Sequence, residues 1–108
     1  MNDINTTVAE LKKHIQDFSD ARGWHTGQNA KDLVMALTVE AAELAEIFTW
    51  LHSDEVDGAA ADPKVLGDIK DEIADVFWYL CRICGHFGID LSEAVDGKTL
   101  KNAVKYPV

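Results

Sequence analysis

The chain has 108 residues, of which 19 are Asp or Glu and 10 are Lys or Arg, so its formal net charge is −9. With 47% hydrophobic and 27% charged residues it has the composition of an ordinary soluble globular domain, and no apolar run approaches the ~20 residues that cross a bilayer. An acidic surface repels a phosphate backbone, and no cationic segment followed by an apolar one marks the N-terminus for export. We therefore expect a cytoplasmic protein that binds neither nucleic acid nor membrane.

The first half of the chain predicts two helices. Apolar residues at three- and four-residue spacing indicate a helix over residues 5–21, closed at Arg22-Gly23: Val8, Leu11, Ile15 and Phe18. Residues 24–29 are expected to form a loop. A second helix is expected from residue 29 or 30 to residue 51.

The second half predicts two more helices after a polar connection at residues 53–58. Asp62-Pro63 is a start signal, because a capping side chain is followed by proline in the first turn. This third helix is expected to reach residue 84 or 87, before Gly88. The segment 90–93 has the shape of a capping box and opens a fourth helix that runs to about residue 105. No alternating strand pattern competes, so we expect an all-α chain of the four-helix-bundle type.

The two central helices carry the acids. At about 100° per residue, Glu40 and Glu43 border the apolar stripe of the second helix, which consists of Leu33, Leu37, Ala41, Leu44, Phe48 and Leu51. The stripe of the third helix consists of Leu66, Ile69, Ile73, Phe77, Leu80 and Cys84. Beside it lies a polar ridge of Asp68, Glu72, Asp75 and Tyr79, extended by Arg82 and His86. If the two helices pack antiparallel, Glu40, Glu43, Glu72 and Asp75 converge.

Four converging carboxylates need protons or cations between them. Mg²⁺ is the natural partner, because it is a hard cation that a few carboxylates, waters and substrate phosphates usually hold. Acid pairs at this spacing are also frequent on helix surfaces, where they are merely solvated. The pattern becomes specific only when it is taken together with its neighbours.

Those neighbours carry a resemblance to a known family. The motifs are Glu40-Ala-Ala-Glu43, a spacer from Leu44 to Asp71, and Glu72-Ile-Ala-Asp75. They resemble the E-x-x-E and E-x-x-D signature of the MazG-like all-α nucleoside triphosphate pyrophosphohydrolases, and most of all their small dCTP-pyrophosphatase-like members. The closing segment, with Lys98, Asn102 and Lys105-Tyr106-Pro107, is also similar to that of the family.

The resemblance implies a single MazG-like nucleotide pyrophosphohydrolase domain over residues 1–108. It implies Mg²⁺ ligands at Glu40, Glu43, Glu72 and Asp75, with Mn²⁺ as a substitute. Such an enzyme converts a nucleoside triphosphate, here expected to be a dNTP, to the monophosphate and pyrophosphate, and so keeps non-standard or surplus deoxynucleotides out of the dNTP pool. Glu43 is the candidate proton acceptor. A homodimer or a dimer of dimers is expected to complete the fold.

The resemblance also suggests residues that bind the substrate. Trp24, Trp50 and Tyr79 are candidates for contact with base and sugar, while Lys98, Asn102 and Tyr106 are candidates near the phosphates. Lys31 is a further candidate, since it stands where the small dCTP-hydrolysing members tend to have Arg. Because this position and the following Asp32 depart from the family pattern, the preferred base stays open.

Three other interpretations were weighed. A phosphoribosyl-ATP pyrophosphohydrolase shares the acid pattern, and a non-catalytic helical module could use its acids to bind a basic partner. Cys81 and Cys84 form a C-x-x-C, but a zinc site needs four ligands and no second pair exists, so packing explains the two thiols better.

Overall fold

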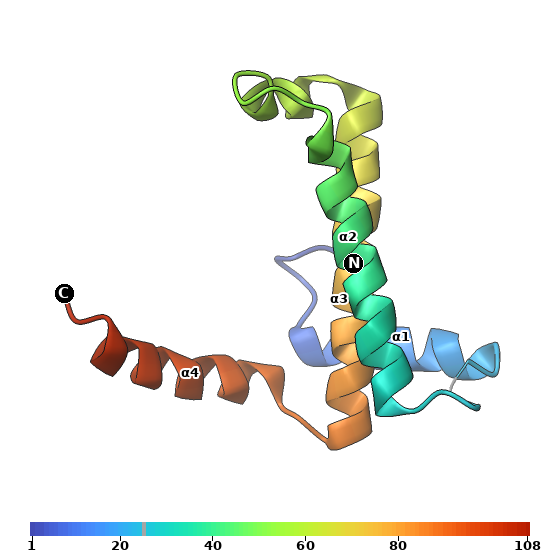
Figure 1. Ribbon diagram of the computed structural model, residues 1–108. Coiled ribbons are helices and arrows are strands. Elements are labelled where there is room, and N and C mark those ends of the chain that lie inside the picture. The colour runs from blue at the N-terminus through green and yellow to red at the C-terminus, as the bar shows by residue number, and fades with distance from the viewer. Residues whose placement is uncertain (25) are drawn as a thin grey trace.

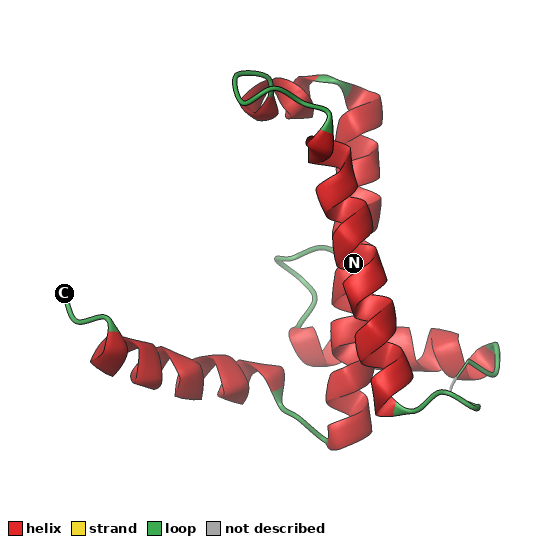
Figure 2. Cartoon of the chain, in the orientation of Figure 1, coloured by secondary structure: helices red, strands yellow, loops and turns green. Residues whose placement is uncertain are grey.

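The computed structural model describes residues 1–24 and 26–108, and every regular element within them is a helix (Figures 1 and 2). In chain order these are α1 (Val8–Ala21), α2 (Ala30–Thr49), the short 3-10 helix η1 (Val56–Ala61), α3 (Pro63–Phe87) and α4 (Leu91–Lys105). The all-α prediction is confirmed. None of these helices has the length and apolar character that spanning a membrane requires. His25, in the loop expected at residues 24–29, lies outside the described residues.

Reciprocal caps set the starts of the first two helices. The Thr7 hydroxyl accepts a hydrogen bond from the Glu10 backbone N–H at 3.1 Å, and the Glu10 carboxylate accepts one from the Thr7 N–H at 3.1 Å. This capping box starts α1 at Val8, three residues later than expected. Asn29 and Asp32 repeat the arrangement at α2, whose expected start is confirmed.

Aspartates cap the other two long helices. The Asp62 carboxylate accepts from the Lys64 N–H at 3.0 Å, and the Asp90 carboxylate accepts from the Glu93 N–H at 2.9 Å. α3 ends at Gly88, whose φ of 63° is left-handed and suits glycine. These boundaries agree with the expected ones. The 3-10 helix η1 was not expected, because its sequence Val-Asp-Gly-Ala-Ala-Ala has no helical periodicity.

The long helices α2 and α3 run side by side in opposite directions, α1 packs across α3, and α4 extends away from the pair (Figure 1). The buried side chains gather mainly where α1, the start of α2 and the last turns of α3 meet. They are few for a chain of this length: Ile15, Ser19, Leu33, Ala59, Cys81, Arg82 and Cys84. No residue of α4 is buried.

The expected apolar stripes are only partly covered. Leu33 and Cys84 are buried, and half-buried positions line the rest of the seam: Leu37, Leu44, Phe48, Leu51, Leu66, Ile69 and Phe77. Ala41 is exposed, however, and so are Ile73, at 53%, and Leu80. The stripe expected on α3 is therefore wrong at Ile73 and Leu80, because α1 and α2 cover only part of that helix.

Candidate metal and nucleotide site

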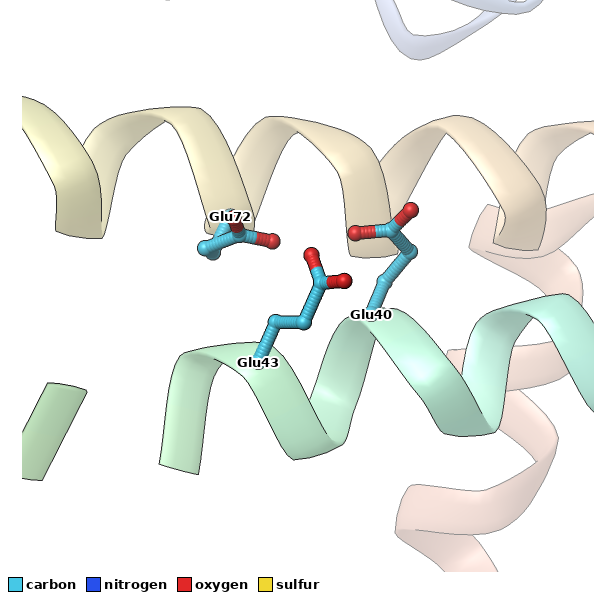
Figure 3. Close-up of side chains that lie close together, drawn as sticks. All are labelled: Glu40, Glu43 and Glu72. Atoms are coloured by element: carbon cyan, nitrogen blue, oxygen red, sulfur yellow. The ribbon is translucent and has the colours of Figure 1, made fainter. Parts of the chain in front are cut away.

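Three glutamates meet at the seam between α2 and α3 (Figure 3). Glu40 and Glu43 lie one turn apart on α2, and Glu72 faces them from α3. One carboxylate oxygen from each lies within 4.8 Å of the other two. Glu72 was expected on a ridge beside the apolar stripe, and the antiparallel packing turns this flank of α3 toward α2. We call Glu40, Glu43 and Glu72 the carboxylate cluster.

The carboxylate cluster contains negative charge that the surrounding residues do not compensate. Oε2 of Glu40 and Oε2 of Glu72 are buried and accept no hydrogen bond from the described residues. Burial, contact with the Glu72 carboxyl group and the charges of Asp75 and Glu43 raise the pKa of Glu40 to about 7. The pKa of Glu72 is also raised, first by burial and then by Glu43 and Asp75. Without a bound cation, the cluster therefore retains a proton close to neutral pH.

These donors fit a hard divalent cation. All three side chains offer carboxylate oxygens, and two of those oxygens are buried without a partner. Glu43 is exposed, so one side of the cluster stays open to solvent and to a ligand. A cation at this point would satisfy the orphaned oxygens and stabilise the ionised glutamates. The carboxylate cluster can thus hold a metal ion.

Asp75 lies one turn of α3 beyond Glu72 and outside the group of three. Its side chain is exposed, yet its charge raises the pKa of both Glu40 and Glu72. With Glu40 it lines a neighbouring cavity. The structure thus brings three of the four expected ligands together and places the fourth beside them. Ligation by each of the four stays a prediction.

Two cavities flank the carboxylate cluster. The first, of about 350 Å³, is lined by Glu40 and Asp75, by Arg82, and by four aromatic residues: Phe18, Trp24, Trp78 and Tyr79. The second, of about 520 Å³, is lined by Glu43, Glu72 and Trp50 among others. Both volumes suit small molecules. Two of the expected base-contacting aromatics therefore lie on the Glu40 side, and Trp50, which is 83% exposed, lies on the Glu43 side.

Aromatic contacts shape the cavity on the Glu40 side. The Phe18 ring meets the Trp24 ring edge-on with centroids 5.7 Å apart and the Trp78 ring edge-on at 5.2 Å. The Arg22 guanidinium covers Phe18 at 3.4 Å from the ring centroid. Such contacts hold the rings in place and leave an apolar wall against which a planar base can pack. Trp78 also lines this cavity.

Four of the expected substrate-binding residues lie away from the carboxylate cluster in this chain. Lys31 is exposed in the first turn of α2, roughly 13.5 Å along the helix axis from Glu40. Lys98, Asn102 and Tyr106 belong to α4 or its end, are exposed, and follow a helix that extends away from α2 and α3 (Figure 1). Their contact with substrate stays a prediction.

Arg82 is the residue whose place sequence reasoning missed. It was expected to extend the polar ridge of α3, and in the structure its side chain is buried and donates hydrogen bonds to the Trp24 carbonyl and the Gln28 side chain. The available signal was its spacing, because Arg82 continues the helical face of Glu72, Asp75 and Tyr79. The crossing of α1 over this end of α3 buries it.

The two cysteines are free and buried, as the packing interpretation predicted. Burial, together with the charge of Cys84, raises the pKa of the Cys81 thiol to about 11. The thiol therefore stays protonated near neutral pH, which makes it a poor nucleophile and a poor metal ligand.

The sequence of this chain is similar to those of known proteins. Residues 35–108 match the MazG-like family. The chain is 31% identical over 102 residues to dCTP pyrophosphatase 1 of Mus musculus and 29% identical over 101 residues to dCTP pyrophosphatase 1 of Homo sapiens. Each alignment covers 94% of this chain, and the chain spans about 60% of the length of these relatives.

The whole fold also has a solved counterpart. It superimposes with a TM-score of 0.84 on the crystal structure of a pyrophosphatase from Archaeoglobus fulgidus DSM 4304, at 40% sequence identity. This similarity covers 93% of this chain and 92% of that one. The family match includes both acid motifs and therefore all of the carboxylate cluster. This chain belongs to the MazG-like family.

Proposed function

We propose that residues 1–108 form a single nucleotide pyrophosphohydrolase domain that uses Mg²⁺, with Mn²⁺ as a substitute, to convert a (d)NTP to the (d)NMP and pyrophosphate. The observation that carries this proposal is the carboxylate cluster, with its two orphaned oxygens, in a chain that belongs to the MazG-like family. The pyrophosphatase named above and the relatives named dCTP pyrophosphatase 1 support it. Removal of non-standard or surplus deoxynucleotides is the corresponding cellular role.

The chain's own residues have distinct tasks in this proposal. Glu40, Glu43, Glu72 and Asp75 hold the cation. When bound there, a divalent cation neutralises charge on the triphosphate oxygens and favours in-line attack by water. Glu43 is the exposed member of the carboxylate cluster, so it is the one placed to accept the proton of the attacking water.

The flanking aromatics bind the nucleoside in this proposal. Trp24 and Tyr79 pack against the base in the cavity on the Glu40 side, which also contains Asp75. Trp50 covers the ligand from the Glu43 side. A base that enters beside Glu40 leaves its phosphates at the open face of the carboxylate cluster, where Glu43 is exposed.

Self-association completes the site in this proposal. Lys98, Asn102 and Tyr106 follow a helix that extends away from the carboxylate cluster of its own chain, so a second copy must supply them if they contact phosphate. Exposed apolar side chains on three helices are available to bury: Val34, Met35, Val39, Ile73, Leu80, Val95, Leu100 and Val104. A homodimer or a dimer of dimers uses these surfaces. Sedimentation velocity that gives only a monomer would contradict this part.

The test is a panel of dNTPs and NTPs incubated with the protein and Mg²⁺, with the products identified by anion-exchange chromatography. The expected products are the monophosphate and pyrophosphate, and Glu40→Gln or Asp75→Asn abolishes their formation. Asp54→Asn is the matched control, because it removes one negative charge at an exposed position outside both cavities.

Two results of the panel would contradict the proposal. Orthophosphate with a diphosphate would contradict the choice of bond. Hydrolysis of phosphoribosyl-ATP with no turnover of free dNTPs or NTPs would assign the chain to the rival enzyme that shares the acid pattern.

A further inference from the structure

A second group of charged side chains lies near the C-terminal end of α3. A cavity of about 470 Å³ opens there between α1, the start of α2 and the last turns of α3. No carboxylate of the described residues lines it. Its polar lining consists of the cationic side chains of Lys12, Lys13 and Arg82, the amides of Gln16 and Gln28, and the imidazole of His86. We call it the cationic cavity, and in a chain with a net charge of −9 it is an exception.

Arg82 brings an uncompensated charge to the cationic cavity. It is only 7% exposed, and its Nη2 donates to the Trp24 carbonyl at 2.9 Å and to the Gln28 side-chain oxygen at 2.6 Å. Both acceptors are neutral, and no carboxylate of the described residues forms an ion pair with it. A guanidinium buried without a counter-charge is costly, so this position favours a bound anion.

Lys12 brings a second positive charge that no carboxylate of the described residues pairs with. Its Nζ donates to the Ile89 carbonyl at 2.8 Å, which is again a neutral acceptor. Lys13 differs, because Asp17 already pairs with it at 2.7 Å. Two cations without an anionic partner, Lys12 and Arg82, therefore line one cavity.

Gln28 adds a donor in a defined orientation. A guanidinium only donates hydrogen bonds, so the amide of Gln28 must present its oxygen to Arg82. Its NH₂ group is left as a donor for a ligand. The guanidinium, the ammonium and this amide together offer several donors to an acceptor-rich anion.

No member of the carboxylate cluster forms an ion pair with Arg82, although Arg82 also lines the cavity that contains Glu40 and Asp75. Glu72 and Arg82 are ten residues apart on α3, which is about 15 Å along the helix axis. Arg82 also reaches the cationic cavity, which no carboxylate of the described residues lines. An anion can therefore bind near Arg82 although the chain is acidic overall.

We propose that the cationic cavity binds a phosphate-bearing small molecule, with Arg82 and Lys12 as its counter-charges. Phosphate matches the guanidinium fork and the several donors better than a singly charged anion does, and about 470 Å³ accommodates a diphosphate. This site goes beyond the proposed hydrolysis, which uses the carboxylate cluster. Free pyrophosphate and the phosphates of a nucleotide share the required chemistry.

The test is isothermal titration calorimetry of the full chain with inorganic pyrophosphate in excess EDTA, where no hydrolysis takes place. We expect saturable binding with about one ligand per chain. Arg82→Gln weakens it about tenfold or more, and Lys12→Gln about threefold.

Lys70→Gln is the matched control, since it makes the same charge change outside the cavity and leaves the affinity unchanged. Circular dichroism checks each variant for folding, and Lys12→Gln decides the matter if Arg82→Gln does not fold.

A parallel titration with dCTP in EDTA separates the two sources of phosphate. Tighter binding of dCTP than of pyrophosphate, weakened by the same two variants, assigns the cavity to a nucleotide, and equal or weaker binding assigns it to free pyrophosphate. Absence of saturable binding in the native protein would overturn the proposal. So would an equal loss of affinity in Lys12→Gln and Lys70→Gln, which would show a general charge effect.

Discussion

The carboxylate cluster and the cationic cavity use the same helix in opposite ways. Glu72 of α3 helps to gather negative charge, with two buried oxygens that have no hydrogen-bond partner among the described residues. Further along the helix, Arg82 is a buried cation whose hydrogen-bond acceptors are all neutral. Neither region has an ion pair among the described residues that compensates its charge.

Two exposed ion pairs elsewhere on the surface differ from both regions. Lys13 and Asp17 lie 2.7 Å apart and Lys64 and Asp68 lie 3.1 Å apart, each at i and i+4 on an exposed helix face. Such pairs contribute little to stability, typically about 0–1 kcal/mol. What distinguishes the carboxylate cluster and Arg82 is that their charged atoms are buried without a counter-charge among the described residues, and a ligand could supply that counter-charge.

The largest expected effect comes from neutralising the carboxylate cluster. Glu72→Gln should lower the rate of nucleotide hydrolysis by about a hundredfold or more, because a ligand of the cation is lost. The same change should raise the melting temperature of the metal-free protein, since it relieves repulsion among the glutamates. Initial rates and thermal melts measure both effects. Lower activity together with a lower melting temperature would indicate a structural role for Glu72 instead.

The second-largest expected effect is the stabilisation of the protein by a divalent cation, which should require the carboxylate cluster and not the cationic cavity. Mg²⁺ at a hundred times its dissociation constant should stabilise the native protein by about 2.7 kcal/mol, since it binds only the folded chain. Thermal melts at increasing Mg²⁺ concentration should show a rising melting temperature for the Lys12→Gln variant and not for the Glu40→Gln variant. An equal increase in the melting temperature of the Glu40→Gln variant would indicate that the cation binds elsewhere.

Trp24 links the regions, because its ring lines the cavity beside Glu40 while its carbonyl accepts from Arg82. Trp24→Leu keeps the carbonyl and removes the aromatic surface. We expect KM for the nucleotide to rise about tenfold with kcat nearly unchanged, as for lost stacking on a base. Pyrophosphate binding in EDTA serves as the control and should be unaffected. A fall in kcat with an unchanged KM would contradict a role in binding the base.

The smallest expected effect is on the pH dependence of stability. Glu40 has an ordinary pKa of 4.5 and, in the folded protein, a pKa raised to about 7 by burial and by neighbouring carboxylates. Between these values the folded state holds the extra proton, so metal-free stability should decline as pH rises from 4.5 to 7. Thermal melts should show a drop of roughly a few degrees that is weaker in Glu40→Gln. If the melting temperature rose over this pH range relative to that of the Glu40→Gln variant, the raised pKa assigned to Glu40 would be contradicted.

Local features of the fold could be predicted from the sequence, and features that depend on packing could not. Asn29, Asp62 and Asp90 act within a few residues of themselves, and the helix starts that they cap were predicted. The spacing of Glu40 and Glu43 likewise predicted a shared face. The burial of Arg82 depends on where α1 crosses α3, and no local pattern contains that information.

The same limit applies to the edges of the site. Whether Asp75 joins the other three acids depends on how closely α2 and α3 pack, and the spacing of the motif does not specify this. The exposure of Ile73 depends on how much of α3 the helices α1 and α2 cover. The 3-10 helix η1 has no periodic signature and was read as a polar connection.

The most direct measurement of the central claim is a crystal structure with Mn²⁺ and a non-hydrolysable dNTP analogue, with anomalous data collected at the manganese edge. The carboxylate cluster should coordinate the manganese, so the strongest anomalous peak should lie among the oxygens of Glu40, Glu43 and Glu72 with the phosphates against it. A peak at other residues, or none while the nucleotide is bound, would contradict the assignment of this cluster as the metal centre.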